Sequence, residues 1–361
     1  MEIKLINSKR DRKKFIDFYR KQYRKNTRTR DSLSRSLEKI VNKKAKLCDS
    51  VYLEAIAITE DEEIIMSAIL AQADRMSDVL QIAFFESSSY SPAAFKLLLD
   101  RAYYLAGERG ATKISASLNL HVNYGLGFLH SDYDKDQSFG MPYNPEFYHN
   151  YFENHNFLAI DLISYKKKMD GMNNLISDRL KSRLDKRYRV RTIDFKRFEE
   201  EINLYTDINN QSFKEHLFYY RRDQAEDLEL FKDLKLLLKE ENLLFVEKDG
   251  QAVGFMLWYP DFNQLIKKGK SIGLETLIKN KLFSKKIDCF KIVEIGVIPS
   301  ERDRGAILAL FEACFQRVKG RFENFESSWI LDENNKSKAF GIKWSDAQSK
   351  KYRAYIKELQ Q

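Results

Sequence analysis

The sequence contains few residues of the kind that bind metals or form covalent cross-links. Its three cysteines, Cys48, Cys289 and Cys314, are widely separated and include no Cys-x-x-Cys pair. Its five histidines include no His-x-His or His-x-x-x-His pair. These spacings argue against a structural zinc site, a histidine metal centre and a disulfide framework. We therefore expect a protein of a reducing compartment that binds no metal.

Long hydrophobic runs are absent as well. No apolar run approaches the roughly 18 residues that a membrane-spanning helix needs. The first residues, MEIKLINSKRDRKK, lack the apolar core of a secretory signal. We therefore expect a cytoplasmic protein without a membrane span. Hydrophobic residues nevertheless make up 43% of the 361 residues, which is enough to fill the cores of two domains of roughly 150–180 residues each.

Positive charge is concentrated near the N-terminus. Residues 9–46 contain 16 lysines and arginines against four acidic residues, while the whole chain has a net charge of +9. Phe15, Ile16, Phe18 and Tyr19 recur among these charges, which favours the solvated face of one or two helices. Binding of nucleic acid, of an acidic lipid surface or of an anionic substrate remains an alternative. Nucleic acid is the weaker of these alternatives, because no RNP-like motif or zinc-finger spacing accompanies the charge.

The two halves of the chain show the same order of predicted elements. After the basic segment, residues 1–170 contain strand patterns at 51–59, 64–73 and 79–85, a helix pattern at 93–108 and further strand patterns near 113 and 160. Residues 171–361 contain a strand at 188–194, helices at 195–210 and 222–240, a hairpin at 243–259, a strand at 291–298, a helix at 306–319 and strands at 325–332 and 351–359. This order predicts a mixed α/β fold that occurs twice.

The stretch VIPSERDRGAILALF, residues 297–311, joins a predicted strand to a predicted helix. Arg302 and Arg304 add positive charge at the turn, and Gly305 allows a ligand to approach the backbone. The first turn of a helix also presents N–H groups and the positive end of the helix dipole. This arrangement suits a pyrophosphate, although any basic helix N-terminus offers the same groups.

The turn resembles the coenzyme-A pyrophosphate loop of the GCN5-related N-acetyltransferase (GNAT) superfamily. In that pattern a strand is followed by Arg/Gln-x-x-Gly-x-Gly/Ala and a helix; here Ile307 stands where Gly or Ala is usual. Further segments resemble a subgroup of tandem GNAT-fold bacterial proteins: GMPYNPEFY (140–148), VGFMLWYPDFNQLIKK (253–268), GVIPSERDRGA (296–306), WILDEN (329–334) and KKYRAY (350–355). The resemblance implies two tandem GNAT-like domains, a degenerate one at 1–170 and a coenzyme-binding one at 171–361.

The resemblance also implies an N-acyltransferase that moves an acyl group from acetyl-CoA or another acyl-CoA to the amine of a small molecule or peptide. The thioester would lie between the strands 291–298 and 325–332. The residues implied in coenzyme binding are Val297, Ile298, Arg302, Arg304, Gly305, Ala306 and Asn334. Asn334 has an equally good alternative role as a helix cap.

Direct attack by an amine requires a base that keeps the amine neutral. Glu294 is the first candidate, because a period of two places it on one strand face with Ile292 and Gly296, and apolar neighbours raise the proton affinity of a carboxylate. An ordinary surface ion pair is the alternative, and Glu326 is the substitute base. In the family a tyrosine usually donates a proton to the departing thiolate, and residues 335–341 contain no such tyrosine. Tyr352 or Tyr355 could be the proton donor instead; the alternative is that both are packed aromatic residues.

The N-terminal half has no basic turn after the strand 79–85. The sequence SSSYSP enters the helix there, and serines that cap a helix explain it, so we expect no second coenzyme site. Four polar residues of its long loops are candidate substrate contacts: Asn119, Asn123, Tyr143 and Asn144. Turn formation between Pro142 and Pro145 is an alternative explanation for Tyr143 and Asn144. Two other functions remain open, an aminoacyl transferase that uses charged tRNA and a non-catalytic binding protein with the same fold.

Overall fold

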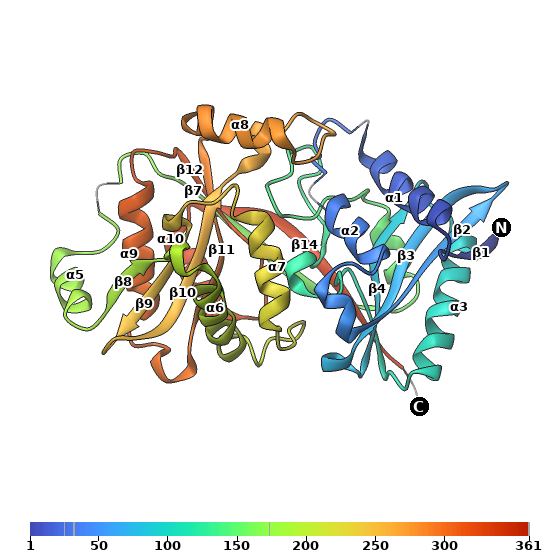
Figure 1. Ribbon diagram of the computed structural model, residues 1–361, viewed down its shortest axis with the longest axis horizontal. Helices are drawn as coiled ribbons and strands as arrows, with labels where there is room; N and C mark the ends of the chain where they lie inside the picture. Colours follow the sequence, from blue (N-terminus) through green and yellow to red (C-terminus); the bar gives the residue numbers. More distant parts are fainter. Residues whose placement is uncertain (25, 32, 173, 360–361) are drawn as a thin grey trace.

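The strands of the computed structural model join into one sheet. The structure describes residues 1–24, 26–31, 33–172 and 174–359, and within these residues it contains ten α-helices and a 14-stranded mixed sheet. The two halves of the chain lie side by side along the long axis (Figure 1). The predicted mixed α/β class is confirmed. None of the described helices has the length and apolar composition needed to cross a membrane.

The N-terminal half places helices on both faces of its strands. Its strands are β1 (Glu2–Leu5), β2 (Val51–Glu60), β3 (Glu63–Ala73), β4 (Val79–Ser87), β5 (Lys113–Ala116), β6 (Phe128–Leu129) and β7 (Leu158–Lys168). Its helices are α1 (Lys9–Arg24), α2 (Ser34–Val41), α3 (Pro92–Glu108) and α4 (Tyr148–Glu153). Alternation along the strands separates two cores, since Ile56 and Ile58 pack with α3 while Ala57 packs with α1 and α2.

The basic segment forms helices, as the pattern of Phe15, Ile16, Phe18 and Tyr19 predicts. These four side chains of α1 are buried, while most of its lysines and arginines lie at the surface. The apolar stripe therefore fixes α1 on the sheet and leaves its charged face outward.

The C-terminal half repeats this layering. Its strands are β8 (Arg189–Thr192), β9 (Leu243–Lys248), β10 (Gln251–Pro260), β11 (Cys289–Val297), β12 (Asn324–Ser327), β13 (Ile330–Leu331) and β14 (Ala347–Glu358). Its helices are α5 (Asp178–Asp185), α6 (Phe198–Ser212), α7 (Gln224–Leu234), α8 (Leu274–Phe283), α9 (Ala306–Val318) and α10 (Asn335–Trp344). One core lies under α9 and another under α6 and α7, with Trp258 in the first and Phe255 in the second.

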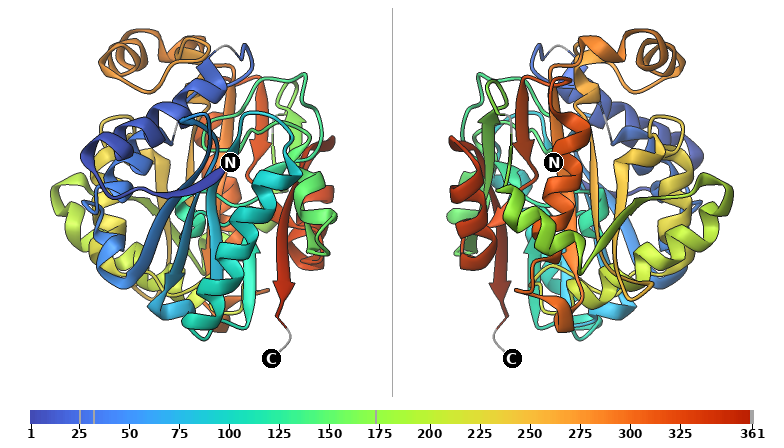
Figure 2. Two further views of the ribbon diagram at one scale, coloured as in Figure 1. Left: turned by 90° about the vertical axis from the view of Figure 1, so that its right-hand side faces the viewer. Right: turned by 90° about the vertical axis from the view of Figure 1, so that its left-hand side faces the viewer.

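The last strand of each half pairs with the other half. The sheet order is β1-β2-β3-β4-β5-β14-β7-β12-β11-β10-β9-β8, so β14 lies between β5 and β7, while β7 pairs with β12. β14 runs from the C-terminal half into the N-terminal half (Figures 1 and 2). Its residues Tyr352, Ala354 and Tyr355 are fully buried there. The exchange fuses the two halves into one sheet.

The C-terminal βαβ unit forms as predicted, with one difference. β11 and β12 are parallel and α9 connects them. The strand expected at 325–332 is instead two short strands, because the chain leaves β11 after Ser327 and then pairs with β7 through β13.

Candidate functional site

β11 and β12 diverge in the middle of the sheet. Their parallel pairing ends at Ile292 and Ser327, although β11 continues to Val297. At the same point the register with β10 shifts and leaves Val293 without a partner, which is a β-bulge. A bulge bends the strand, so the C-terminal half has an opening between two parallel strands. The bulge also interrupts the period of two on which the face assignment of Glu294 depended.

The N-terminal half has the same opening, but one of its own side chains bridges it. The pairing of β4 with β5 ends at Ile82 and Ala116, and a register shift against β3 follows at once. Phe84 lies in this bulge with a positive φ of 49°. Its N–H donates to Oδ1 of Asn119, at 2.7 Å, from the segment that follows β5.

The turn before α9 leaves the start of the helix without a side-chain cap. Gly305 occupies the N-cap position in the left-handed region, with φ of 102°, and no side chain caps the helix there. A Cβ at this position would lie 2.8 Å from Cδ2 of Leu184, so the positive φ favours glycine and a larger residue would also have to displace the Leu184 side chain. The backbone N–H groups of the first turn therefore have no side-chain cap as a partner.

A buried carboxylate holds this turn in place. Glu301 accepts hydrogen bonds from the Tyr188 hydroxyl at 2.9 Å and from Nζ of Lys248 at 2.7 Å. The bond from Lys248 holds the pKa of Glu301 below its ordinary value. Anchored in this way, the turn presents Arg302 and Arg304 at its surface.

The two arginines and Ile307 differ in what they contact. Nη2 of Arg302 donates to the Ser212 carbonyl at 2.7 Å, which links the turn to the end of α6. The Arg304 side chain is 55% exposed, with its guanidinium 3.7 Å from Glu301. The Ile307 side chain packs against the core beneath α9. Because it packs into the core, the branched side chain of Ile307 is accommodated at this position.

The corresponding helix of the N-terminal half is closed by its own residues. Ser91 caps α3 by accepting from the Ala94 N–H, and Pro92 at the first helical position has no N–H to offer. The Ser91 N–H donates to the Tyr151 hydroxyl at 2.7 Å. Serine capping of α3, predicted from SSSYSP, is confirmed.

Glu294 belongs to a partly buried polar cluster. Its Oε1 accepts from Nη2 of Arg222 at 2.7 Å, and its Oε2 accepts from the Tyr205 hydroxyl. Arg222 is almost fully buried and also lies 3.6 Å from Asp227, whose pKa is raised by burial. Nδ2 of Asn123, from the N-terminal half, donates to Asp227 at 3.0 Å. The cluster thus connects the bulged strand of one half to a loop of the other.

The other predicted catalytic and coenzyme residues lie apart from this cluster. Although burial opposes it, Lys291 and Lys350 hold the pKa of Glu326 below its ordinary value, and Glu326 accepts from the Ser138 hydroxyl at 2.6 Å. Tyr352 is fully buried on β14, and among the described residues its hydroxyl has no hydrogen-bond partner. Asn334 caps α10 by accepting from the Ser337 N–H at 3.1 Å.

Val297 and Ile298 lie at the end of β11 beside the opening. Val297 is in register with Gly254, and the Ile298 N–H donates to the Val253 carbonyl at 2.9 Å. These bonds fix the end of β11 to β10, on the side away from β12.

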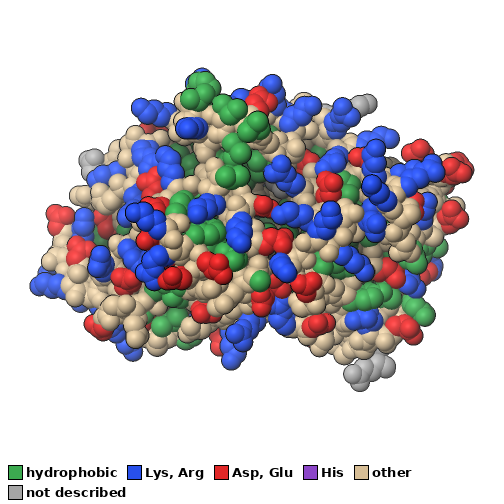
Figure 3. All heavy atoms as spheres, in the orientation of Figure 1, with side chains coloured by type: hydrophobic (Ala, Val, Ile, Leu, Met, Phe, Trp, Pro, Cys, Tyr) green, Lys and Arg blue, Asp and Glu red, His purple; other side chains and the backbone are tan. Residues whose placement is uncertain are grey.

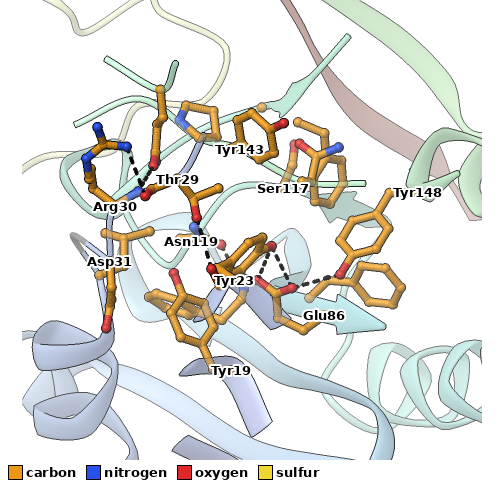
Figure 4. A pocket seen from close by; sticks show the side chains of 18 residues that line it. Tyr19, Tyr23, Thr29, Arg30, Asp31, Glu86, Ser117, Asn119, Tyr143 and Tyr148 are labelled. Atoms are coloured by element: carbon orange, nitrogen blue, oxygen red, sulfur yellow. Dashed lines mark hydrogen bonds between the residues drawn. The ribbon is translucent and has the colours of Figure 1, made fainter. Parts of the chain in front are cut away.

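Three of the four expected substrate residues line one pocket in the N-terminal half. Asn119, Tyr143 and Asn144 line a pocket of about 60 Å³ that opens to solvent, together with residues of α1, β4 and the loop after β5 (Figure 4). Oδ1 of Asn144 accepts from the Leu129 N–H at 2.6 Å, and the Tyr143 hydroxyl donates to the Tyr133 carbonyl at 2.6 Å. Asn123 lies outside the pocket, at the Arg222 cluster.

The pocket contains a carboxyl group that the sequence did not single out. Glu86, at the end of β4, accepts from the hydroxyls of Tyr23 and Tyr148 at 2.7 Å (Figure 4). Burial raises its pKa to about 8, so this carboxyl is mostly protonated at neutral pH. Ser117 lies in the same wall with a positive φ of 73°, and its buried hydroxyl has no partner among the described residues. The sequence feature that could have pointed to Glu86 is a charged residue placed between two phenylalanines and a serine.

No protein-family model matches the chain. Over 279 residues it is 26% identical to the bacterial ceramide synthase of Caulobacter vibrioides, which covers 74% of this chain and 72% of that protein.

Among solved structures, the chain is similar to the GCN5-related glucosamine N-acetyltransferase region of a fungal multi-domain β-N-acetylglucosaminidase, with a TM-score of 0.58 and 12% identity. That match covers 99% of this chain, and the chain spans 38% of that protein. A tandem GNAT protein from the clavulanic acid biosynthesis pathway gives a TM-score of 0.54 at 8% identity, over 99% of this chain and 98% of that one. The element order, the two strand openings and these likenesses together show that the chain has the fold of tandem GNAT proteins.

Proposed function

We propose that the protein is an acyl-CoA-dependent N-acyltransferase whose C-terminal half binds the coenzyme. The observation that carries the proposal is the uncapped start of α9 at Gly305, beside the opening between β11 and β12. A pyrophosphate can accept from the N–H groups of that first turn and from Arg302 and Arg304. The ceramide synthase name of the Caulobacter relative supports acyl transfer.

The remaining coenzyme contacts follow from this placement. The pantetheine arm extends along β11 past Val297 and Ile298, where β11 has no pairing with β12. The amide of Asn334 retains donor capacity after capping α10 and contacts the arm from the other side. Acetyl-CoA is the donor we propose first, with longer acyl-CoA thioesters as the alternative.

The proposed reaction is a direct attack by an amine on the thioester carbonyl. Glu294 takes the proton that the amine loses as the new C–N bond forms, and the C–S bond breaks. Water then donates a proton to the departing thiolate, because the Tyr352 hydroxyl, the donor expected from the sequence, is fully buried on β14. The acceptor is the amine of a small molecule or peptide, with Asn119, Tyr143 and Asn144 as pocket contacts and Asn123 as a contact beside Asp227.

Calorimetry with acetyl-CoA and with a long-chain acyl-CoA tests the coenzyme site. Arg302→Ala/Arg304→Ala is expected to weaken binding at least about tenfold, because each charge-assisted hydrogen bond is worth roughly 1.5–3 kcal/mol. Arg197→Ala is the matched control, since Arg197 is an exposed arginine paired with Glu200. Thermal unfolding of all three proteins shows whether the loss of the Ser212 contact disturbs the fold.

No heat from the unaltered protein with either donor would exclude the proposal, as would unchanged affinity of the double variant. If the coenzyme binds and no amine from a broad panel releases free thiol, the chain is a coenzyme-binding protein rather than a transferase. Glu294→Gln separates the two steps, because it is expected to lower turnover and to leave the calorimetric affinity unchanged.

A further inference from the structure

The segment between β10 and β11 exposes an apolar stripe that the fold does not use. In α8, Leu274, Ile278 and Leu282 recur at intervals of four, so they share one face. Their exposures are 73%, 50% and 66%, which are values for side chains that face solvent. Leu277 packs against the core beneath the helix and Thr276 is buried, so α8 is attached to the protein by its other side.

Lysines surround this stripe. Lys267, Lys268 and Lys270 precede the helix, Lys281 lies within it, and Lys285 and Lys286 follow it, all exposed. Glu275 is the one acidic residue from 267 to 286, and it is paired with Lys267 and Lys279. Figure 3 shows hydrophobic side chains over α8, at the top of the molecule, with blue side chains on both sides. The surface around α8 therefore presents apolar side chains and positive charge together.

The loop before α8 is hydrogen-bonded to the basic N-terminal segment. The Gly269 N–H donates to the Thr29 carbonyl at 3.0 Å, and the Asp31 N–H donates to the Lys270 carbonyl at 2.9 Å. α1, which ends a few residues before this junction, carries seven exposed basic residues: Lys9, Arg10, Lys13, Lys14, Arg20, Lys21 and Arg24. α8 lies at the top of the molecule, and α1 runs down from the junction on the side towards which α8 projects (Figures 1 and 2).

We propose that α8 and the adjoining basic edge dock on the surface of an anionic membrane. Leu274, Ile278 and Leu282 enter the boundary between headgroups and acyl chains, while the lysines contact the anionic headgroups. Lys281, three residues after Ile278, lies beside the stripe, and Lys285 follows the end of the helix. Their long aliphatic stems can pass along apolar surface while their ammonium groups reach the headgroups. A nucleic acid would match the charge but would leave the apolar stripe in water, so a lipid surface accounts for both features.

The proposal is independent of the acyl-transfer reaction, because it uses none of the residues assigned to the coenzyme or the acceptor. It also gives a role to the charge of residues 9–46, which coenzyme binding leaves unexplained.

Sedimentation of the full chain with vesicles tests the proposal. The protein is expected to pellet with phosphatidylcholine vesicles that contain about one third phosphatidylglycerol, to remain in solution with phosphatidylcholine alone, and to be released as salt is raised beyond physiological strength. Leu274→Ser/Ile278→Ser/Leu282→Ser and Lys281→Glu/Lys285→Glu/Lys286→Glu are each expected to reduce the bound fraction about tenfold or more.

Leu158→Ser/Leu236→Ser is the control for apolar exposure, because these leucines are 66% and 70% exposed elsewhere on the protein. Lys96→Glu is the control for charge, since Lys96 is an exposed lysine of α3. Both controls are expected to bind vesicles as the unaltered protein does. Failure of the unaltered protein to bind anionic vesicles would overturn the proposal. Undiminished binding by the triple serine variant, or retention on immobilised RNA in place of vesicle binding, would overturn it too.

Discussion

Replacement of Glu86 by glutamine removes an ionisable group from the interior of the N-terminal half and leaves its size almost unchanged. The glutamine amide can keep a hydrogen bond with each of Tyr23 and Tyr148, because it has both an acceptor oxygen and donor hydrogens. The two proteins should therefore differ mainly in how their stability depends on pH.

The sign follows from the direction of the shift. Burial raises the pKa of Glu86 from an ordinary value of 4.5 to about 8, so the folded state binds the proton more tightly than the unfolded state. The resulting stability is fully present below the unfolded value and is lost as pH rises towards the folded value. The complete loss is on the order of 5 kcal/mol, from 1.36 kcal/mol per pKa unit, and about half of it falls between pH 6 and pH 9.

Chemical unfolding at pH 6 and pH 9 measures this difference. The unaltered protein is expected to lose roughly 2–3 kcal/mol more than Glu86→Gln between the two pH values. Glu108→Gln, which removes an exposed carboxylate from the end of α3, is the matched control and should follow the unaltered protein. Parallel pH profiles for the unaltered protein and Glu86→Gln would refute the reasoning, because Glu86 would then ionise as easily in the folded chain as in the unfolded one.

Three further substitutions test the turn, the cluster and β14. Gly305→Ala should lower the melting temperature and the affinity for acyl-CoA, since the new Cβ combines a positive φ with a contact of 2.8 Å to Cδ2 of Leu184. Gly107→Ala, within helix α3, is the control: its Cβ would have nothing within 4 Å, so it should be neutral or stabilising in the same scan. Arg222→Leu should cost about 3–5 kcal/mol in chemical unfolding, because two carboxylates lose their buried counter-ion; a cost below about 1 kcal/mol would contradict the cluster. Tyr352→Phe should leave the melting temperature unchanged or raise it, because it removes a buried hydroxyl without a partner in the described part of the chain. A clear fall in that scan would mean that the hydroxyl is bonded.

Local patterns predicted most of the elements and the turn, because both depend on residues close in sequence. The hairpin at 243–259, the helix α9 and the capping of α3 follow from periodicity, turn residues and serine caps. The exchange of β7 and β14 between the two halves does not follow from local patterns. It depends on which strands, distant in the sequence, these two strands pair with. The split of the strand at 325–332 has the same origin, because its second part pairs with β7.

The side-chain partners of the candidate site could not be predicted from the sequence for the same reason. Glu294 was assigned apolar neighbours from its own strand, yet its contacts come from Tyr205 on α6 and Arg222 before α7. A bulge at Val293, which no local signal marked, changes the face on which the following residues lie. Burial raises the pKa of Glu86, while the hydrogen bonds from Tyr23 and Tyr148, which are separated from it by about sixty residues in each direction, partly oppose the rise.

The two halves share the strand opening and differ in the start of the helix, and this difference limits the number of coenzyme sites. In the N-terminal half Asn119 bridges the opening, while Ser91 and Pro92 close the start of α3. Asn119→Ala would remove the bridge but would restore no N–H group at Pro92 and add no cation. Calorimetry should therefore give one acyl-CoA per chain for this variant, as for the unaltered protein. A second equivalent of acyl-CoA would show that the strand opening alone is sufficient, and the assignment of the pyrophosphate to the turn at Gly305 would then fail.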